Sequence, residues 1–267
     1  MAPFVREAGA EHTGGTPVLC LHANASSSSQ WRALMDLLAT QYRVLAPDLL
    51  GAGRSARWPA AAGARLQHEL DALADLLDGL GGRVHLVGHS YGGAVAMRIA
   101  LTWPDRVASL LLYEPTMFPL LGQPHPGQPG AIGISAVAAA AIAEVERGNL
   151  QAAAAGFIDY WMGAGAWAAM PEARRGQVAD SMRPIRQWTD AIFAEPWSLG
   201  DLAGLSVPTL LLGGEASPAS AHDLLPLLAG ALPQATLQVL PGLGHMAPAI
   251  QPQAVNPLIK GFLHSQA

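Results

Sequence analysis

Short apolar runs alternate along the chain with longer stretches in which apolar residues recur at helical spacing. The runs are nearly continuous in apolar residues, which is the pattern of strands buried on both faces of a parallel sheet. They cover residues 17–22, 43–50, 83–90, 106–115, 207–214 and 235–242. The stretches of helical spacing cover residues 30–40, 66–80, 92–103, 220–232 and 252–265. Strand and helix in this alternation predict an α/β fold with a mostly parallel, doubly wound sheet.

The alternation stops between residues 116 and 199. A Pro- and Gly-rich stretch, "PLLGQPHPGQPG" at 119–130, leads into an Ala-rich segment and then into segments that contain Trp, with no strand-like run among them. We interpret this region as a helical cap that is inserted between two strands. The sequence therefore predicts a core made of residues 1–115 and 200–267, with a helical insertion at 116–199.

The composition indicates a large apolar core and gives no sign of nucleic-acid binding. Hydrophobic residues make up 51% of the 267 residues, charged residues make up 13%, and the formal net charge is −5. A basic surface is the usual footprint of a nucleic-acid-binding protein, so we expect no such partner. Cys20 is the single cysteine, which excludes an intramolecular disulfide and any C-x-x-C motif.

We expect a cytoplasmic protein without a membrane partner. The N-terminal stretch has no apolar segment of the signal-peptide kind, and the longest apolar runs, such as 134–143, fall short of the ~20 residues that a membrane span needs. The pattern does not set an oligomeric state.

The stretch "VGHSYGG" at 87–93 follows one predicted strand and opens the next predicted helix. It contains G-x-S-x-G with Ser90 at its centre. In that setting, a sharp turn projects the serine hydroxyl from the end of a strand, and Gly88 and Gly92 leave room where strand and helix crowd together. Ser90 is therefore the predicted nucleophile.

A serine hydroxyl needs a neighbouring base to take its proton. His245, in "LPGLGHMAP", follows the last predicted strand and precedes the last predicted helix. This position places it on a loop at the same end of the sheet as Ser90, and we predict that it is the base.

With these motifs the chain resembles the α/β-hydrolase-fold enzymes over nearly its whole length. Six segments occur in the order found in that family: "LHANASSSSQW", "YRVLAPDLLGAGRS", "VHLVGHSYGGAVA", "RVASLLLYEP", "VPTLLLGGE" and "LPGLGHMAP". The resemblance implies an α/β-hydrolase fold. It also implies an oxyanion hole made by the backbone N–H groups of Asn24 and Tyr91. The loop reads His22-Ala23-Asn24 where the family usually has Gly in the middle, so we expect Ala23 to alter its shape.

The third member of a catalytic triad is a carboxylate that accepts the other imidazole N–H. Members of this family usually carry an aspartate near Ser217, but "LLLGGEASPAS" at 210–220 contains only Glu215. Glu114 ends the strand after the nucleophile helix, where an unpartnered carboxylate would be costly. Haloalkane dehalogenases of the same superfamily often place their acid at a similar position. We therefore predict Glu114 as the acid, with Glu215 as the alternative.

The predicted function is hydrolysis of a small-to-medium apolar ester or lactone through an acyl-enzyme on Ser90, without a cofactor or a metal ion. Apolar side chains of the helical insertion are expected to form the pocket wall. They are Met117, Phe118, Tyr160, Trp161, Met162, Trp167, Trp188 and Phe193. Other chemistries of the same fold stay open, namely those of a C–C bond hydrolase, a thioesterase and a perhydrolase, as does a non-catalytic ligand receptor.

Overall fold

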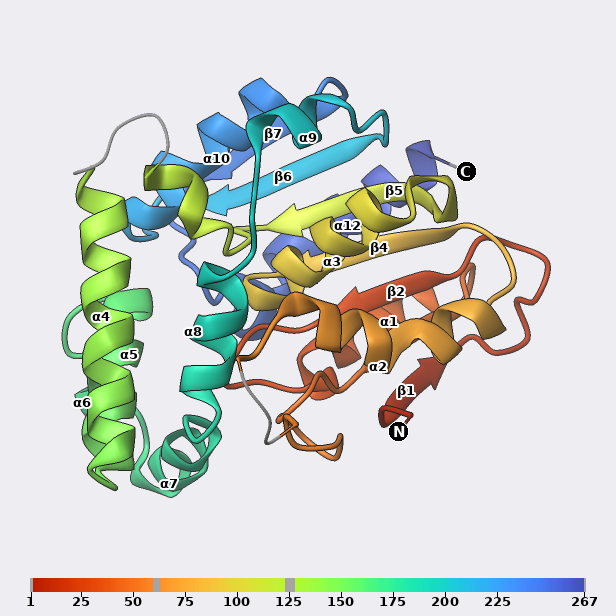
Figure 1. Cartoon of the computed structure of the whole chain (residues 1–267). Helices are drawn as coiled ribbons and strands as arrows, with labels where there is room; N and C mark the ends of the chain where they lie inside the picture. The colour runs from red at the N-terminus through yellow and green to blue at the C-terminus, as the bar shows by residue number, and fades with distance from the viewer. Residues whose placement is uncertain (1, 60–62, 123–127, 267) are drawn as a thin grey trace.

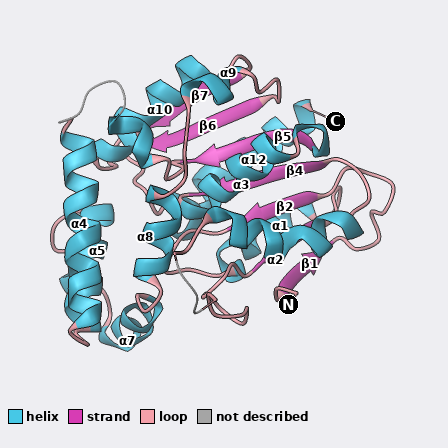
Figure 2. Cartoon of the chain, viewed as in Figure 1, coloured by secondary structure: helices cyan, strands magenta, loops and turns pink. Residues whose placement is uncertain are grey.

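A seven-stranded sheet lies at the centre of the protein (Figures 1 and 2). The computed structural model describes residues 2–59, 63–122 and 128–266. The strands are β1 (Val5–Ala8), β2 (Val18–Leu21), β3 (Val44–Pro47), β4 (Val84–His89), β5 (Val107–Tyr113), β6 (Thr209–Gly214) and β7 (Ala235–Leu240). Their order is β1-β3-β2-β4-β5-β6-β7, and every pairing is parallel except that of β1 with β3. This is the predicted α/β-hydrolase fold.

β1 is the strand that the apolar pattern does not predict. It is four residues long, pairs on one side only and is mostly half-buried. A short edge strand of this kind carries charged side chains such as Arg6 and Glu7, and so lacks a continuous apolar run.

Helices cover both faces of the sheet. The larger elements are α1 (Arg32–Leu38), α2 (Leu66–Gly79), α3 (Tyr91–Thr102), α4 (Pro129–Glu146), α5 (Leu150–Met162), α7 (Glu172–Ser181), α8 (Ile185–Phe193), α10 (Ala219–Ala231) and α12 (Pro252–Ser265). The short ones are η1 (Ser28–Trp31), η2 (Pro104–Arg106), η3 (Phe118–Gly122), α6 (Ala166–Ala169), α9 (Leu199–Ala203) and α11 (Ala247–Ile250). All five helical stretches predicted from periodicity form helices within one or two residues of the expected bounds.

The two faces of the sheet belong to two separate apolar clusters, because successive strand residues point to opposite sides. Leu19 and Leu21 of β2 pack in the cluster that contains buried apolar side chains of α2, α3 and α10. Val18 and Cys20 of the same strand pack in the cluster with α1 and α12. The continuous apolar runs in the sequence follow from this burial on both sides.

The described residues between β5 and β6 form helices and no strand. α4 packs against α5, α8 and α10, and Figure 1 shows α4, α5 and α8 beyond the carboxyl ends of the parallel strands. By length and composition alone, α4 is long and apolar enough to cross a membrane. In the structure it packs against the other helices of this region. Residues 123–127 of the predicted Pro/Gly-rich loop lie outside the described residues, and α9 extends across the predicted boundary at residue 199.

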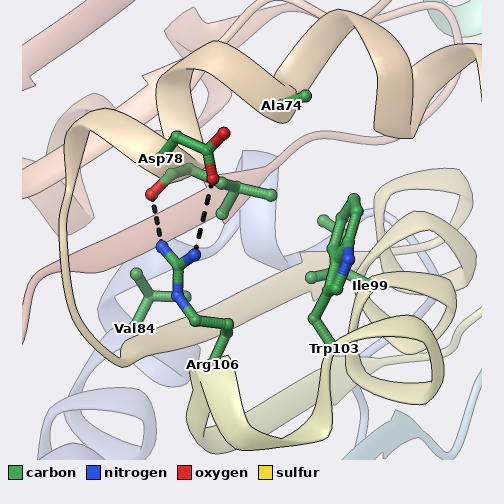
Figure 3. Close-up of a pocket in the computed structure, with 7 residues that line it drawn as sticks. Ala74, Asp78, Val84, Ile99, Trp103 and Arg106 are labelled. Carbon is green, nitrogen blue, oxygen red and sulfur yellow. Dashed lines mark hydrogen bonds and ion pairs between the residues drawn. The ribbon is translucent and has the colours of Figure 1, made fainter.

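A hollow opens between α2 and α3 at the amino ends of β4 and β5 (Figure 3), away from Ser90 at the carboxyl end of β4. Arg106 beside it donates to the carbonyls of Leu77 at 2.6 Å and Gly82 at 3.0 Å, and lies 3.5 Å from the Asp78 carboxylate. Leu77 and Asp78 lie in the last turn of α2 and Gly82 lies just after it, so Arg106 caps the C-terminus of this helix.

Candidate active site

Ser90 lies on a sharp turn between the end of β4 and the start of α3. Its backbone has φ 53° and ψ −116°, a conformation that non-glycine residues adopt at a cost. A Cβ on Gly92 would approach the carbonyl oxygen of Leu21 to 2.2 Å, and one on Gly88 would approach Gly93 Cα to 2.6 Å. The predicted crowding around the two glycines is thereby confirmed, and it explains why the turn requires them.

The structure brings Ser90, His245 and Glu114 into one hydrogen-bonded chain. The Ser90 hydroxyl lies 3.0 Å from Nε2 of His245, and the Nδ1 of the same imidazole lies 2.6 Å from Oε2 of Glu114. The three residues come from three places in the sequence: the end of β4, the loop after β7 and the end of β5. All three are buried, with at most 4% of each residue exposed. This order of contacts allows the imidazole to take the serine proton while the carboxylate holds its other N–H.

Glu114 is held by three further contacts around its carboxylate and backbone. Oε1 accepts the Gly214 N–H and the Ser217 hydroxyl, each at 2.6 Å, and the Glu114 backbone N–H donates to the carbonyl of Leu212. Its φ of 45° turns the backbone out of the strand. Burial alone would raise the pKa of this carboxyl, but the hydrogen bond and charge of His245 and the bonds from Gly214 and Ser217 outweigh burial and lower the pKa. The side chain is therefore a carboxylate at neutral pH.

Glu215 is placed away from His245. It is exposed, and its Oε2 accepts the N–H of Gly242 at 3.0 Å in the turn after β7. Ser217, at the position where the family usually has its aspartate, contacts Glu114. Of the two glutamates weighed from the sequence, the one that contacts the imidazole is Glu114.

The N–H groups of Asn24 and Tyr91 have no acceptor within the described part of the chain. Tyr91 is the first residue of α3, where a helix leaves its N–H unpaired. Asn24 lines the same cavity as Ser90. The loop before it is fixed by Gln30, whose Oε1 accepts the Ala23 N–H at 3.2 Å. Within this loop the positive φ occurs at Ala25 (53°), two residues after Ala23.

Two buried histidines hold the loops around the site. Leu49 N–H donates to His22 Nε2 at 3.0 Å, and His22 Nδ1 donates to the Ala23 carbonyl at 2.7 Å. His89 Nε2 donates to the carbonyl of His245 at 2.8 Å, which fixes the loop that carries His245. Burial lowers the pKa of both imidazoles, and for His89 the nearby His245 lowers it further. Both side chains are therefore neutral supports.

Glu69 is a buried acid next to the site that the sequence analysis did not single out. Its carboxyl accepts the Tyr91 hydroxyl at 3.0 Å and the Leu50 N–H at 3.1 Å. Burial raises its pKa to about 7, although both hydrogen bonds act in the opposite direction. The signal was present in the sequence: Glu69 lies three residues after Leu66 and four before Leu73, on the apolar face of its helix.

The cavity at Ser90 is lined mainly by apolar side chains. They come from residues 23–26, from α5, from α7 with Met170 before it, and from α11 with Met246 before it. Trp161 and Met162 are the two predicted pocket residues among them. Arg174 of α7 and His245 are the titratable residues of the lining.

The other predicted pocket residues lie outside this lining, which corrects the sequence analysis. Trp188 donates its indole N–H to the Leu50 carbonyl at 3.3 Å and packs on Tyr91, and Tyr160 donates its hydroxyl to Ser220 at 2.9 Å. The remaining four are Met117, Phe118, Trp167 and Phe193. Met117 is fully buried and Phe118 lies behind Trp161, stacked on its ring. Aromatic residues at helical spacing here pack the helices on the core, and helical spacing alone does not distinguish that role from contact with a substrate.

Within the described ranges, no group of three or more His, Cys, Asp or Glu side chains is placed to hold a metal ion.

The chain belongs to the alpha/beta hydrolase family, whose model matches residues 18–258. It is 43% identical to the lipase LipV of Mycobacterium tuberculosis over 106 residues, which are 39% of this chain and 39% of the lipase. It is 37% identical to the 2-hydroxymuconate semialdehyde hydrolase of a Pseudomonas species over 102 residues, 37% of this chain and 36% of that enzyme. The matched stretch is thus less than two fifths of the length of each curated relative.

A solved structure is similar over nearly the whole chain. An esterase from Thermogutta terrifontis superposes with a TM-score of 0.73 and 28% identity, covering 98% of this chain and 93% of the esterase. Fold and family are thereby shown, and the substrate has to be argued from the site.

Proposed function

We propose that this protein is a serine hydrolase that cleaves a small-to-medium apolar carboxylic ester or lactone through an acyl-enzyme on Ser90. The observation that carries the proposal is the chain of contacts from Ser90 through His245 to Glu114, all of them buried. The esterase and lipase named above support it at the level of the family.

In the first half-reaction, His245 Nε2 takes the hydroxyl proton as Ser90 Oγ forms a bond to the carbonyl carbon. Glu114 stabilises the imidazolium that results. The carbonyl oxygen becomes an oxyanion, and we propose that the N–H groups of Asn24 and Tyr91 bind it. When the C–O bond to the alcohol breaks, His245 returns its proton to the leaving oxygen.

In the second half-reaction, His245 takes a proton from water, and the resulting hydroxide attacks the ester carbonyl of acylated Ser90. Collapse of this second tetrahedral intermediate breaks the bond to Ser90 Oγ, which regains its proton from His245. The carboxylic acid leaves. In a lactone the alcohol and the acid are parts of one molecule, so the product is a hydroxy acid.

The lining of the cavity supports this substrate class. Phe157, Ile158, Trp161 and Met162 of α5 and Met246, Ala249 and Ile250 near α11 give it apolar walls. Walls of this kind bury alkyl or aryl groups and contribute about 25 cal/mol for each Å² of apolar surface removed from water.

The test is the initial rate of hydrolysis of p-nitrophenyl acetate, butyrate and octanoate by the wild-type protein and by Ser90→Ala. We expect turnover that disappears in the variant, and a chain-length trend that reports the size of the pocket. Wild-type rates equal to those of Ser90→Ala would reject the proposal. A receptor role would then be supported by ligand binding without turnover.

Arg174 favours a second candidate, a hydrolase of anionic substrates. It lies one helical turn before Val178, and both residues line the cavity. The guanidinium has no partner within the described residues. Every other arginine of the insertion bonds to a carboxylate or a carbonyl; these are Arg147, Arg175, Arg183 and Arg186. An exposed, unpaired guanidinium that lines the same cavity as Ser90 suits a substrate carboxylate.

The relative named a 2-hydroxymuconate semialdehyde hydrolase gives this candidate a concrete probe. If the protein is a C–C bond hydrolase of that kind, wild type consumes 2-hydroxymuconate semialdehyde faster than p-nitrophenyl esters. Arg174→Gln should then lower kcat/KM for the acid by about tenfold, whereas Arg183→Gln, on the exposed surface, should leave it unchanged. Faster turnover of the neutral esters, with no effect of Arg174→Gln, would reject this second candidate.

A further inference from the structure

The indole of Trp161 lies flat on the imidazole of His245. The two ring centroids are 3.9 Å apart and the ring planes are inclined by 26°. Trp161 is 5% exposed and belongs to α5, whereas His245 belongs to the loop after β7. The contact therefore joins the helical insertion to the base of the proposed triad.

Ring packing alone sets the orientation of this indole. Its Nε1–H has no hydrogen-bond partner within the described residues. Phe118 stacks on it, with 6.2 Å between the centroids and 27° between the planes, and Phe157 and Tyr160 meet it edge-on. Tyr160 is itself anchored by its hydrogen bond to Ser220 on α10. Trp161 thus has neighbours that hold its ring in place against His245.

The other contacts of the imidazole lie in its own plane or belong to neutral groups. Ser90 and Glu114 contact its two nitrogens, and these bonds leave the ring free to tilt about the line that joins them. His89 packs near it with a centroid distance of 5.0 Å and is neutral. Glu114 is the one charged side chain in contact with the imidazole among the described residues. The face of the ring is covered by Trp161.

We propose that Trp161 is a positioning residue, which keeps the His245 imidazole aligned between Ser90 and Glu114 and stabilises its protonated form. The inference rests on the proposed function, because it assigns a role in the same acyl transfer. When His245 Nε2 takes the Ser90 proton, the ring becomes a cation against an aromatic face, and that arrangement is attractive. Nothing is transferred to or from the indole. The insertion thus contributes to the catalytic centre as well as to the walls of the pocket.

The test compares Trp161→Leu, which keeps an apolar cover without an aromatic face, with Trp161→Phe, which keeps a smaller one. Trp167→Leu is the matched control, because Trp167 is in the same insertion but outside the cavity lining. We expect Trp161→Leu to lower kcat for p-nitrophenyl acetate by about tenfold with little change in KM. Trp161→Phe should recover most of this loss, and Trp167→Leu should match the wild type.

The pH profile separates positioning from a role as pocket wall. Loss of the aromatic face makes the imidazolium harder to form, so the acidic limb of kcat/KM in Trp161→Leu should move to lower pH by about half a unit. A change in KM alone, with an unmoved acidic limb, would overturn the proposal. Thermal unfolding of each variant establishes that it is folded.

A measurement without turnover keeps this test independent of the proposed function. The imidazole of His245 can be titrated by NMR in the wild type and in Trp161→Leu. A lower midpoint in the variant supports the role of Trp161, even if the natural substrate is no ester. Equal midpoints would contradict that role, whatever the rates on p-nitrophenyl esters are.

Discussion

Ser217 donates its hydroxyl to Oε1 of Glu114 at 2.6 Å, while His245 holds Oε2 of the same carboxylate at 2.6 Å. The position at which we expected the family's aspartate is thus occupied by a residue that contacts a carboxylate from the end of another strand. The N–H of Gly214, at the end of β6, donates a second hydrogen bond to Oε1 of Glu114. The serine at residue 217 and the carboxylate at residue 114 belong together, because the Ser217 hydroxyl donates the hydrogen bond that Glu114 Oε1 accepts.

Glu114→Gln should abolish most of the activity on p-nitrophenyl butyrate. The amide cannot stabilise an imidazolium, and its NH₂ can replace the accepting oxygen, which favours the wrong tautomer of His245. We expect kcat/KM to fall by about 10³–10⁴-fold. Glu215→Gln is the control, since Glu215 faces the turn at Gly242, and it should retain nearly full activity. Full activity in Glu114→Gln together with loss in Glu215→Gln would show that the acid has been assigned to the wrong residue.

A carboxylate at residue 217 should partly replace one at residue 114. Because the Ser217 hydroxyl already reaches Glu114 Oε1, an aspartate there would lie close to His245. Starting from Glu114→Gln, the added substitution Ser217→Asp should raise kcat/KM by about tenfold or more. The matched control is Ser217→Ala in the same background, which adds no charge. If the two double variants are equally inactive, residue 217 does not reach the imidazole.

Glu69 should give folding stability a pH dependence of definite sign. Burial raises its pKa from 4.5 to about 7, so the folded state keeps a proton that the unfolded chain releases. The contribution of this proton to the free energy of unfolding is fully present below pH 4.5. It is lost as the pH rises towards 7, and the loss is on the order of 3 kcal/mol.

The measurement for Glu69 is denaturant unfolding of the wild type and of Glu69→Gln at several pH values. The free energy of unfolding of the wild type should fall relative to that of Glu69→Gln as the pH rises from about 4.5 to 7, because Gln cannot titrate. Asp75→Asn, on the exposed face of the same helix, is the control and should track the wild type. A gap that is constant across this range would contradict the shifted pKa.

Gly92→Ala should destabilise the protein, because its Cβ would come within 2.2 Å of the Leu21 carbonyl oxygen, a backbone atom that cannot move aside. We expect a loss of about 1–3 kcal/mol in the free energy of unfolding. Gly230→Ala offers the opposite case: Gly230 lies in α10 with nothing within 4 Å of the new Cβ. There the helix should gain up to about 1 kcal/mol. The change in stability is measured by thermal unfolding. Equal changes in Gly92→Ala and Gly230→Ala would contradict the close contact between residue 92 and the Leu21 carbonyl.

The sheet and its flanking helices could be predicted from the sequence, because the pattern that defines them is local. Strands such as β4, buried on both faces, must be apolar throughout, and α2 must carry leucines at helical spacing. The sharp turn at Ser90 could be predicted for the same reason, since it needs glycines at fixed positions. The short edge strand β1 carries no such signal.

The residues of the pocket wall could not be predicted in the same way, because contacts between elements far apart in the sequence produce no periodic pattern of apolar residues. Trp161 and Trp188 look alike in the sequence, yet one covers His245 and the other packs on Tyr91. The sequence does show Glu69 as a carboxylate on an apolar helix face, but it does not indicate which residue that carboxylate contacts. Arg174 became informative only when its lack of a partner beside the cavity was visible.

The most direct test of the central claim is covalent labelling with diethyl p-nitrophenyl phosphate, followed by mass spectrometry of the peptides. A serine that His245 activates attacks the phosphorus, expels p-nitrophenolate and keeps a diethylphosphoryl group. We predict one such group on each chain, located on Ser90, with loss of ester hydrolysis in proportion to the labelling and no label in Ser90→Ala. Two results would contradict the assignment of Ser90 as the nucleophile. One is a protein that stays unlabelled after incubation with the reagent although it hydrolyses esters. The other is a label on a different residue that by itself accounts for the loss of ester hydrolysis.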